Sequence, residues 1–478
     1  MNEAHDEAHH EAHHETPGEA QGEFIKRVHA PVSVEELFAW HERPGAFQRL
    51  SPPWDPAELL TPHPGIRDGA QVTVRMHAGP VPVTWHIEHR DYIANRQFRD
   101  VQLAGPFDEW EHTHRFESDG NGSALEDHIR YRLPLGAVGE FAAGGYTRET
   151  LDRVFSYRHQ LLLNDLARHA AYADRPRLRI AITGASGFIG TQLSAFLSTG
   201  GHEVLRIGRG EVRPGVVDIA WDPERGQLDP RALEGVDAVV HLAGASIAER
   251  WTKAHREAIR SSRVEGTSLL SHTLAQLDRK PSVLLSGSAI GIYGSRSDEL
   301  LDESSRPGND FLAETCVLWE GATAPAQKAG IRVVHLRTGI VQGAAGGALA
   351  KQAPLFRYGV GGQLGDGTQW VSSIALSDHI GAVHFSMMHD DVRGPVNLVS
   401  PEAVTNAGYT RILGDVLSRP TVATAPAFAL HLLLGQEMAD LTVLASQRVV
   451  PAVLQKAGFR WDFPTLESML RFELGAHA

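Results

Sequence analysis

Apolar and polar residues alternate with a period of two through much of the first third of the chain. The apolar positions of three such runs are Val72, Val74, Met76; Val83, Trp85, Ile87; and Leu125, Ile129, Tyr131, Leu133. The intervening residues, such as Arg75 and Arg130, are polar. Because successive side chains of a strand point to opposite faces, these runs predict an antiparallel sheet with one face in solvent.

A helical period replaces the strand period after the last of these runs. The positions that recur at helical spacing are Leu151, Val154, Phe155, Arg158, Leu162, Asp165 and Leu166. Most of them are apolar, so they predict one long helix packed on the sheet. A shorter helix is predicted at 33–41. One short helix, several strands and one long terminal helix form the element order of a helix-grip fold.

On this element order, residues 23–174 resemble the START-like superfamily of lipid- and ligand-binding domains. The resemblance implies an α+β domain with a cavity between a curved sheet and the long helix. It also implies an apolar ligand, as substrate or as signal. The histidines of this segment form no recognisable catalytic set, and we expect them to be scattered surface residues.

The pattern changes again after Asp174-Arg175-Pro176-Arg177, which has the composition of a linker. Buried strands predicted at 179–183, 237–242, 282–286 and 333–336 alternate with helices, as in a doubly wound parallel sheet of α/β class. From about residue 427 the pattern is mainly helical, with Thr465 as the N-cap of the last helix. The expected domains are a disordered tail (1–22), the START-like domain (23–174), a Rossmann domain (178–425) and a helical extension (426–478). We expect the parts before and after the linker to fold independently.

The composition of the chain indicates which classes of partner and which cellular compartment to expect. The formal net charge of the 478 residues is -13, which disfavours nucleic acid as a partner. A single cysteine, Cys316, cannot form an internal disulfide. The N-terminus lacks the apolar core of a secretory signal, and no apolar run is long enough to span a bilayer. A cytoplasmic location is therefore expected, while the sequence gives no indication of the oligomeric state.

Histidines in the N-terminal tail have the spacing of metal ligands on a helix. His9 with His13, and His10 with His14, are four residues apart. A solvated tail is the simpler interpretation, because the segment has few apolar side chains to offset the entropy of ordering. No metal site is therefore predicted in the chain.

A glycine-rich loop between a buried strand and a helix predicts a dinucleotide site. The loop residues expected to contact the cofactor are Gly184, Ser186, Gly187, Phe188, Ile189 and Gly190. Gly184 would permit the tight turn, Gly187 the close approach of the pyrophosphate, and Gly190 the packing of the helix on the strand. The helix N-terminus would offer free N–H groups and a positive dipole end to phosphate.

The end of the second strand indicates which dinucleotide is bound. NAD enzymes place Asp or Glu there to bond the ribose 2′-hydroxyl. In this chain that place holds Gly208, followed by Arg209. A guanidinium bonds a 2′-phosphate that a carboxylate would repel, so we expect NADP(H) as the cofactor.

Further motifs then resemble the extended short-chain dehydrogenases/reductases, in the branch of the nucleotide-sugar epimerases. The first is the strand that ends in Leu242, Ala243 and Gly244, whose backbone lines the cofactor in that family. The second resembles the strand end that carries the catalytic serine, at Ser288, and runs on to Tyr293. The third comprises the substrate-side positions Arg337 and Trp370 with the segment 372–378. Segments 248–252, 259–263, 310–314 and 319–320 resemble a narrower subfamily. Its members end in a short helical domain of unknown function, and some begin with a START-like domain.

The chain departs from the wider family at its general acid. That family uses a Tyr-x-x-x-Lys pair, in which Lys lowers the pKa of the Tyr phenol for proton exchange with substrate. Phe311 and Thr315 stand at these places. Ser288 remains to hold a substrate oxygen. Tyr293 is the nearest phenol in sequence, as a catalytic residue or a structural one, and Glu314 is either a base or a salt-bridge partner.

Three hypotheses on function follow. The first is an NADP(H)-dependent, epimerase-like oxidoreductase acting on an unidentified small molecule, favoured by Ser288, Arg337 and the complete cofactor loop. The second is a regulatory or ligand-sensing protein that binds NADP(H) without turnover, favoured by the missing Tyr and Lys. The third, a sugar epimerase of the usual kind, would need NAD and the Tyr/Lys pair. Fold alone does not decide among them, because function depends on the site.

Overall fold

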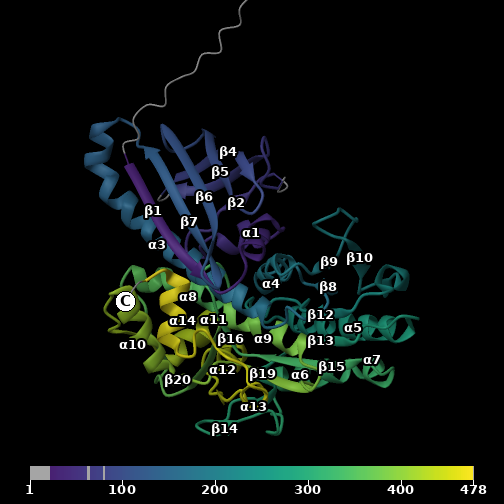
Figure 1. The fold of residues 1–478 in the computed structure, drawn as a ribbon. Helices are drawn as coiled ribbons and strands as arrows, with labels where there is room; N and C mark the ends of the chain where they lie inside the picture. Colours follow the sequence, from purple (N-terminus) through teal and green to yellow (C-terminus); the bar gives the residue numbers. More distant parts are fainter. Residues whose placement is uncertain (1–21, 62–64, 79–80, 477–478) are drawn as a thin grey trace, which may run out of the picture.

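The computed structural model describes residues 22–61, 65–78 and 81–476. The predicted tail therefore lies outside the described residues, apart from Gly22, which is the first residue of strand β1 (Gly22–Ala30). Within the described part of the chain, none of the helices combines the length and the apolar character needed to cross a membrane. A seven-stranded antiparallel sheet and an eight-stranded α/β sheet form the two main parts (Figure 1).

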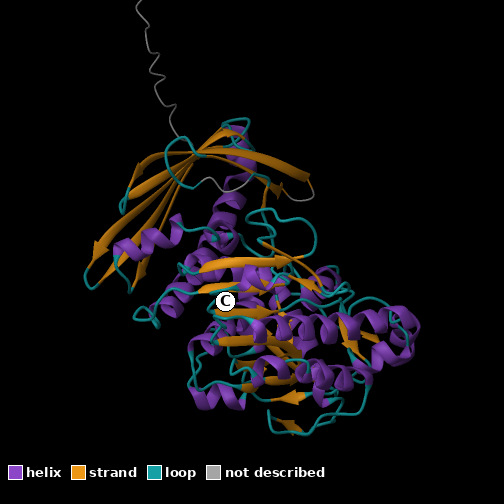
Figure 2. Ribbon diagram, turned by 90° about the vertical axis from the view of Figure 1, so that its right-hand side faces the viewer, coloured by secondary structure: helices purple, strands orange, loops and turns teal. Residues whose placement is uncertain are grey.

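The N-terminal sheet has the strand order β1-β7-β6-β5-β4-β3-β2. The other strands are β2 (Glu58–Leu59), β3 (Gln71–Ala78), β4 (Val81–Ile93), β5 (Gln97–Ala104), β6 (Glu109–Asp119) and β7 (Gly122–Arg132). The period-2 runs of the sequence correspond to β3, β4 and β7, and Leu125, Ile129 and Tyr131 are buried. The sheet curves around its helices (Figure 2), as the helix-grip fold requires.

Three helices complete this domain: α1 (Val34–Glu42), α2 (Ala46–Leu50) and α3 (Ala137–Ala170). Ser33 caps α1 by accepting a hydrogen bond from the amide of Glu36, so the helix begins where the sequence predicts. Helix α3 has 34 residues, and Phe155, Leu162 and Leu166 are among those that it buries. It leaves the sheet and continues into the α/β part (Figures 1 and 2).

The expectation that the histidines of this domain lie scattered on its surface holds for His29 and His86, which are exposed, but is wrong for a group of others. His89, His112, His114 and His159 are all buried, on the inner side of the grip. Two carboxylates lie among them. Oδ2 of the buried Asp127 lies 2.6 Å from His159 Nε2, and Oδ1 of the half-buried Asp100 lies 2.7 Å from His89 Nδ1. Strand pairing and α3 bring these residues together, although they are distant in sequence.

The second sheet has the order β11-β10-β9-β8-β12-β13-β15-β19 and is parallel except for β11. Its strands are β8 (Arg179–Thr183), β9 (Glu203–Gly208), β10 (Ile219–Asp222), β11 (Gln227–Leu228), β12 (Ala238–His241), β13 (Val283–Ala289), β15 (Arg332–Thr338) and β19 (Gly394–Leu398). From β8 the chain first extends the sheet to β9 and then returns to β12 on the other side. This reversal creates a crevice at the carboxyl ends of β8 and β12, where doubly wound folds bind ligands.

Helices cover both faces of this sheet. Helices α4 (Phe188–Thr199) and α9 (Leu376–Met388) pack together on one face, and α5 (Lys253–Gln276) packs with α6 (Phe311–Gly321) and α7 (Ala324–Lys328) on the other. Two short 3-10 helices are η1 (Pro230–Leu233) and η2 (Ile290–Tyr293). The buried cores on the two faces contain Ile182, Leu193 and Val240, and Val239, Leu270 and Leu284, respectively.

Small sheets and helices extend the carboxyl edge of the large sheet. The strands are β14 (Leu300–Leu301) with β22 (Arg448–Val449); β16 (Ile340–Gln342), β18 (Trp370–Ala375) and β20 (Ala403–Thr405); and β17 (Gly362–Leu364) with β21 (Ala423–Ala425). The helices are α8 (Gly347–Arg357), α10 (Asn406–Leu417), α11 (Ala427–Leu434), α12 (Gln436–Leu441), α13 (Ala452–Ala457) and α14 (Leu466–Leu474). The extension after residue 426 is thus mainly helical, and Thr465 caps α14 as predicted.

Buried polar contacts join the N-terminal domain to the rest of the chain. Arg49 binds Asp165 inside the first domain and also donates to Gln192 Oε1 of α4, at 3.0 Å. Arg168 on α3 donates to Asp378 Oδ1 of α9 at 2.7 Å and contacts Asp462. The two parts therefore share buried charges across their contact, and the expectation that each folds independently stays a prediction.

Candidate functional site

The glycine-rich loop turns sharply between β8 and α4. Gly184 has φ +70°, and a Cβ on it would lie 2.9 Å from Ala243 N. A Cβ on Gly190 would lie 2.1 Å from Gly184 O, so α4 packs directly on the loop. Gly187 is the N-cap of α4 and supplies no side-chain cap, which leaves the first amides of the helix to a ligand. Both Ser186 and Gly187 are exposed.

Phe188 and Ile189 start α4 and are half-buried. The Phe188 ring packs against the loop that follows β16, where a Cβ on Gly343 would lie 2.4 Å from the ring. The Phe188 side chain therefore points away from the glycine-rich loop. What this residue can give a cofactor is its backbone N–H.

The second loop of the crevice is fixed by hydrogen bonds to the end of β8. The amides of Leu242 and Ala243 donate to Thr183 Oγ1 at 3.1 and 3.2 Å. His241 lies behind this loop, with Nδ1 2.7 Å from Thr183 Oγ1, and burial lowers its pKa to about 4. A neutral His241 thus supports the loop, while Gly244 remains exposed beside it.

The end of β9 has no room for a carboxylate. A Cβ on Gly208 would lie 2.8 Å from Val217 Cγ2, so glycine is the residue that fits there. The next residue, Arg209, is exposed. Across residues 22–61, 65–78 and 81–476, its guanidinium has no hydrogen-bond or ion-pair partner. Within the described residues, Arg209 is thus a free cation directly after the end of β9.

The expected catalytic serine lies in a buried polar network. Ser288 donates its hydroxyl hydrogen to Glu320 Oε1 at 2.7 Å. Arg337 holds the same carboxylate with two hydrogen bonds, from Nε at 2.8 Å and from Nη2 at 3.0 Å. Burial raises the pKa of Glu320, but the hydrogen bonds and the charge of Arg337, together with His335 and Ser288, outweigh burial, and the pKa lies below its ordinary value. Glu320 is therefore a carboxylate that holds the Ser288 hydroxyl.

Tyr293 belongs to the same network. Arg337 Nη1 donates to the Tyr293 hydroxyl at 3.0 Å, and that hydroxyl donates to Asn397 Oδ1 at 2.7 Å. The side chain is fully buried, and burial raises the pKa of the phenol. These contacts describe a residue that orients Arg337. Ser288, Tyr293 and Arg337 are thus brought together, and Arg337 binds protein groups on each side.

Phe311 and Thr315, which stand at the positions of the missing Tyr-x-x-x-Lys pair, are packed against neighbouring side chains and buried. The Phe311 ring packs under Arg256, whose guanidinium carbon lies 4.3 Å from the ring centroid, and under Arg260 at 5.6 Å. Thr315 is buried and donates to Phe311 O at 2.7 Å. Glu314 is exposed on the outer side of α6 and lies 3.8 Å from Arg260, so its contact is a salt bridge.

Trp370 lies apart from this network, at the start of β18. It lines a cavity of about 650 Å³ together with Asp298, Asp366 and residues of the C-terminal extension, namely Pro426, Ala427, Leu444 and Ser446. The guanidinium of Arg448 covers the Trp370 ring at 4.3 Å. The C-terminal extension therefore forms one wall of a cavity whose other wall includes Trp370.

Glu320, Asn397 and Glu473 were not predicted from the sequence. Glu473 is a buried carboxyl on α14 whose pKa burial raises to about 8, and it lies against the loop on which Phe188 packs. It occupies a position on the apolar face of α14, seven residues after Leu466 and one before Leu474. An acidic residue at an apolar position of an amphipathic helix is the signal that would have found it.

The doubly wound sheet, its switch point and the glycine-rich loop define a nicotinamide-dinucleotide-binding protein of the Rossmann class. Comparison with known sequences agrees with each part of the chain. Residues 180–398 match the NAD dependent epimerase/dehydratase family, residues 30–155 match the family of polyketide cyclase / dehydrase and lipid transport, and residues 425–473 match a domain of unknown function (DUF1731).

Relatives of known name share the α/β part. The Epimerase family protein MT2273 of Mycobacterium tuberculosis is 42% identical over 294 residues, which are 61% of this chain and 96% of that protein. The chain therefore belongs to the epimerase family. Its N-terminal domain is START-like, and it is joined to an α/β domain of the extended short-chain dehydrogenase/reductase type.

Two solved structures are similar to this one. The nucleoside-diphosphate sugar epimerase from Corynebacterium glutamicum has a TM-score of 0.79 and 34% identity, with 95% of this chain and 90% of that chain covered. The human epimerase family protein SDR39U1 (isoform 2), solved with NADPH, has a TM-score of 0.57 and 28% identity, with 62% of this chain and 99% of that chain covered. The first of these similarities extends over the N-terminal domain as well.

Proposed function

We propose that this protein is an NADP(H)-dependent, epimerase-like oxidoreductase that acts on a small molecule. The observation that carries the proposal is the exposed, unpartnered Arg209 directly after Gly208, at the end of β9. A guanidinium there bonds the 2′-phosphate of NADP(H) in bidentate fashion. The similar human protein solved with NADPH supports the same choice.

The residues of the crevice fit a dinucleotide. Gly184 and Gly190 leave space that a Cβ would fill, and the uncapped N-terminus of α4 offers amides to a pyrophosphate. Ser186, Gly187, Phe188 and Ile189 would hold the pyrophosphate, Arg209 the 2′-phosphate, and Leu242, Ala243 and Gly244 the nicotinamide side. When bound, the nicotinamide supplies a hydride donor or acceptor.

Ser288 is the polar group of this chain best placed for a substrate oxygen, because it ends the strand next to β12. Glu320 accepts its proton in a hydrogen bond, so the two lone pairs of Ser288 Oγ remain available. Arg337 and Tyr293 position Glu320 and so act indirectly. Trp370 would contact the distal part of the substrate, in a cavity of the size that small ligands occupy.

A second candidate function is a ligand sensor that binds NADP(H) without turnover. The residues at the positions of the usual Tyr and Lys favour it, because Phe311 has no hydroxyl and the Thr315 hydroxyl already donates to Phe311 O. In that case an apolar ligand of the START-like domain would be the signal. The two candidates share the cofactor and differ in whether the cofactor is consumed.

The cofactor is tested by titration calorimetry with NADPH and NADH. We expect tighter binding of NADPH by the wild type, and a loss of about 1.5–3 kcal/mol for NADPH alone in Arg209→Glu, the value of a charged hydrogen bond. Arg231→Glu is the matched control: Arg231 is 90% exposed on η1, at the amino end of the sheet. Equal affinity of the wild type for both cofactors would contradict the proposal.

Turnover is tested by the absorbance of NADPH during incubation with fractionated small molecules from cells. Fraction-dependent oxidation by the wild type that Ser288→Ala removes would support the oxidoreductase. Ser282→Ala, which changes a serine just before the opposite end of the same strand, should leave that rate unchanged. Tight NADPH binding without consumption in any fraction would favour the sensor.

A further inference from the structure

The buried histidines of the N-terminal domain converge from neighbouring strands. His112 and His114 are two residues apart on β6, so both side chains point to the inner face. Asp100 on β5 pairs with His112 across the ladder, and Asp127 on β7 pairs with His114 on the other side. Sheet register therefore places two imidazoles between two carboxylates.

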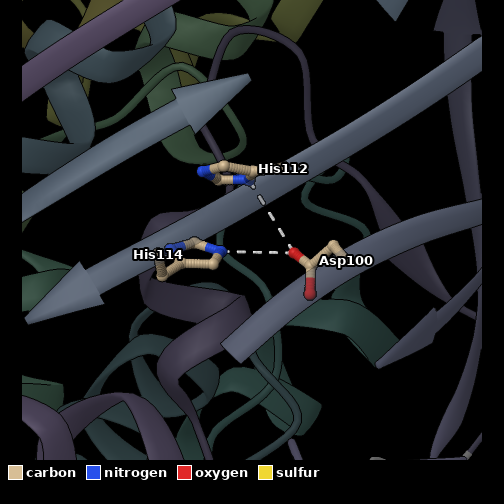
Figure 3. A group of neighbouring side chains, drawn as sticks. All are labelled: Asp100, His112 and His114. Atoms are coloured by element: carbon tan, nitrogen blue, oxygen red, sulfur yellow. Dashed lines mark hydrogen bonds and ion pairs between the residues drawn. The ribbon is translucent and has the colours of Figure 1, made fainter. Parts of the chain in front are cut away.

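One nitrogen of each imidazole faces the same carboxylate oxygen. His114 Nε2 lies 3.3 Å and His112 Nδ1 lies 3.8 Å from Asp100 Oδ2 (Figure 3). The three candidate ligand atoms lie within 4.8 Å of one another. Ligand atoms around a tetrahedral zinc ion with bonds of about 2.0–2.1 Å are about 3.3 Å apart. Small rotations of these side chains would thus bring all three to bonding distance of one ion.

The other nitrogen of each imidazole faces the second carboxylate. Asp127 Oδ1 lies 2.8 Å from His112 Nε2 and 3.0 Å from His114 Nδ1. For His112 this contact is a hydrogen bond, the arrangement usual in metal-binding histidines, in which a carboxylate holds the far nitrogen, fixes the tautomer and orients the ring. Asp127 Oδ2 is held in turn by His159, and Asp100 Oδ1 by His89.

Two carboxylates face the two imidazoles. Asp100 is half-buried and Asp127 is buried, and the positive charge of Arg158 acts on both. A group of carboxylates and imidazoles of this kind can hold either a divalent cation or a proton.

We propose that Asp100, His112 and His114 bind a divalent transition-metal ion of the zinc class inside the helix grip. The ligands are Asp100 Oδ2, His112 Nδ1 and His114 Nε2, and Asp127 positions both rings. Three protein ligands leave at least one coordination position for water or for an oxygen of the molecule held in the grip, as in metal sites that bind a substrate. The site is separate from the dinucleotide crevice.

The test is calorimetric titration of the full chain with Zn²⁺ after chelation and dialysis. The five tail histidines, His5, His9, His10, His13 and His14, are replaced by Gln in every protein used, because two pairs of them have the spacing of metal ligands and would confuse the stoichiometry. We expect one site per chain in this background. His112→Gln, His114→Gln and Asp100→Asn should each abolish it, and Asp127→Asn should weaken it about 10–100-fold.

His128→Gln is the matched control, because His128 follows Asp127 on β7 but points to the outer face and binds Glu23. It should leave the affinity unchanged. A proton shared between His114 and the two aspartates would hold the cluster together without an ion. In that case no site of unit stoichiometry is found, or the ligand variants bind as the parent does, and the proposal is overturned.

A second measurement needs no ligand variants, so it tests the proposal even if those variants fail to fold. Crystals of the same parent protein grown with Zn²⁺ are measured on both sides of the zinc absorption edge. An anomalous peak between Asp100, His112 and His114 supports the site. The absence of a peak there, with or without peaks elsewhere, refutes it.

Discussion

Asp378 joins the three parts of this protein through one carboxylate, and its removal should destabilise the whole chain. The carboxylate is fully buried and accepts three hydrogen bonds: from Arg168 Nη2 at 2.7 Å, from Asp462 N at 2.8 Å and from Phe463 N at 2.9 Å. Burial raises its pKa even beside Arg168, so the charge of the carboxylate depends on this contact.

Asp378→Asn keeps the volume but removes the charge and turns one acceptor into a donor. Breaking a buried ion pair costs about 3–5 kcal/mol. Because Arg168 keeps its contact with Asp462, we expect the lower end of this range, about 3 kcal/mol. The loss should be seen in urea unfolding followed by both tryptophan fluorescence and far-UV circular dichroism, with NADPH absent.

Asp390→Asn is the matched control. Asp390 also pairs with an arginine of the N-terminal part, Arg175, but at 3.5 Å, with side chains that are 78% and 43% exposed. Such a surface pair contributes about 0–1 kcal/mol. If Asp378→Asn cost no more than the control, or if the two spectroscopic probes followed two unlinked transitions of which one did not change, the coupling inferred here would be refuted.

Three further predictions concern single buried groups. Thr315→Lys should lower the free energy of unfolding by about 3–5 kcal/mol, because it buries an ammonium. Thr315→Val, the control, should lower it by about 1 kcal/mol, the value of the lost hydrogen bond. Equal costs in urea unfolding would contradict the burial of this position. Glu473 has a folded-state pKa of about 8, above its ordinary 4.5, so the folded protein binds more protons than the unfolded chain between these values, and the free energy of unfolding should fall as pH rises through this window. Glu473→Gln should flatten that slope and the exposed Glu467→Gln should not; an unchanged slope in Glu473→Gln would assign the effect elsewhere. Burial raises the pKa of the Cys316 thiol to about 12, so a thiol reagent at pH 8 should label the native protein only as fast as it unfolds, and rapid labelling without denaturant would contradict this.

The result for Thr315 bears on how the missing catalytic pair is understood. From the sequence alone, Phe311→Tyr with Thr315→Lys would simply restore the usual acid. In the structure the second position is buried on α6, where the Thr315 hydroxyl donates to Phe311 O. We therefore expect the double variant to be less stable than the wild type and not to gain activity. The difference from the family at these two positions then includes the packing around α6 as well as the two side chains.

The order of elements was predictable because each has a local signal. The period-2 runs gave β3, β4 and β7, the helical period gave α3, and the glycine spacing gave the turn between β8 and α4. Ser33 and Thr465 were recognised as caps for the same reason: a helix N-terminus needs a hydrogen-bond acceptor at one defined position.

The His/Asp cluster was missed because its signal is not local. Asp127 interrupts the apolar face of β7 between Leu125 and Ile129, and His112 and His114 interrupt that of β6. Aspartate and histidine are most often exposed, so each interruption alone indicates little. Only the pairing of β5, β6 and β7 turns three such interruptions into one buried group.

The buried polar network around Ser288 shows the same distinction. Ser288, Tyr293 and Arg337 were identified from motifs at strand ends, and the structure brings them together. Glu320, which links Ser288 to Arg337, lies on α6 in a segment noted only for its resemblance to relatives. Its role depends on the direction of a helix relative to β13 and β15, which sequence spacing does not determine.

Helix α3 has 34 residues and a length of about 50 Å, and it connects the N-terminal domain to the α/β domain. Phe155, Leu162 and Leu166 of this helix pack inside the grip. Arg168, near the end of the same helix, contacts Asp378 of α9 and Asp462 of the C-terminal extension, so one continuous helix joins the grip to the α/β domain. If a ligand in the grip changes the affinity of the crevice for its dinucleotide, the dinucleotide must change the affinity of the grip for that ligand by the same factor. The relatives that consist of the α/β part alone lack this helix. In those relatives no arginine of an N-terminal domain contacts the helix that corresponds to α9.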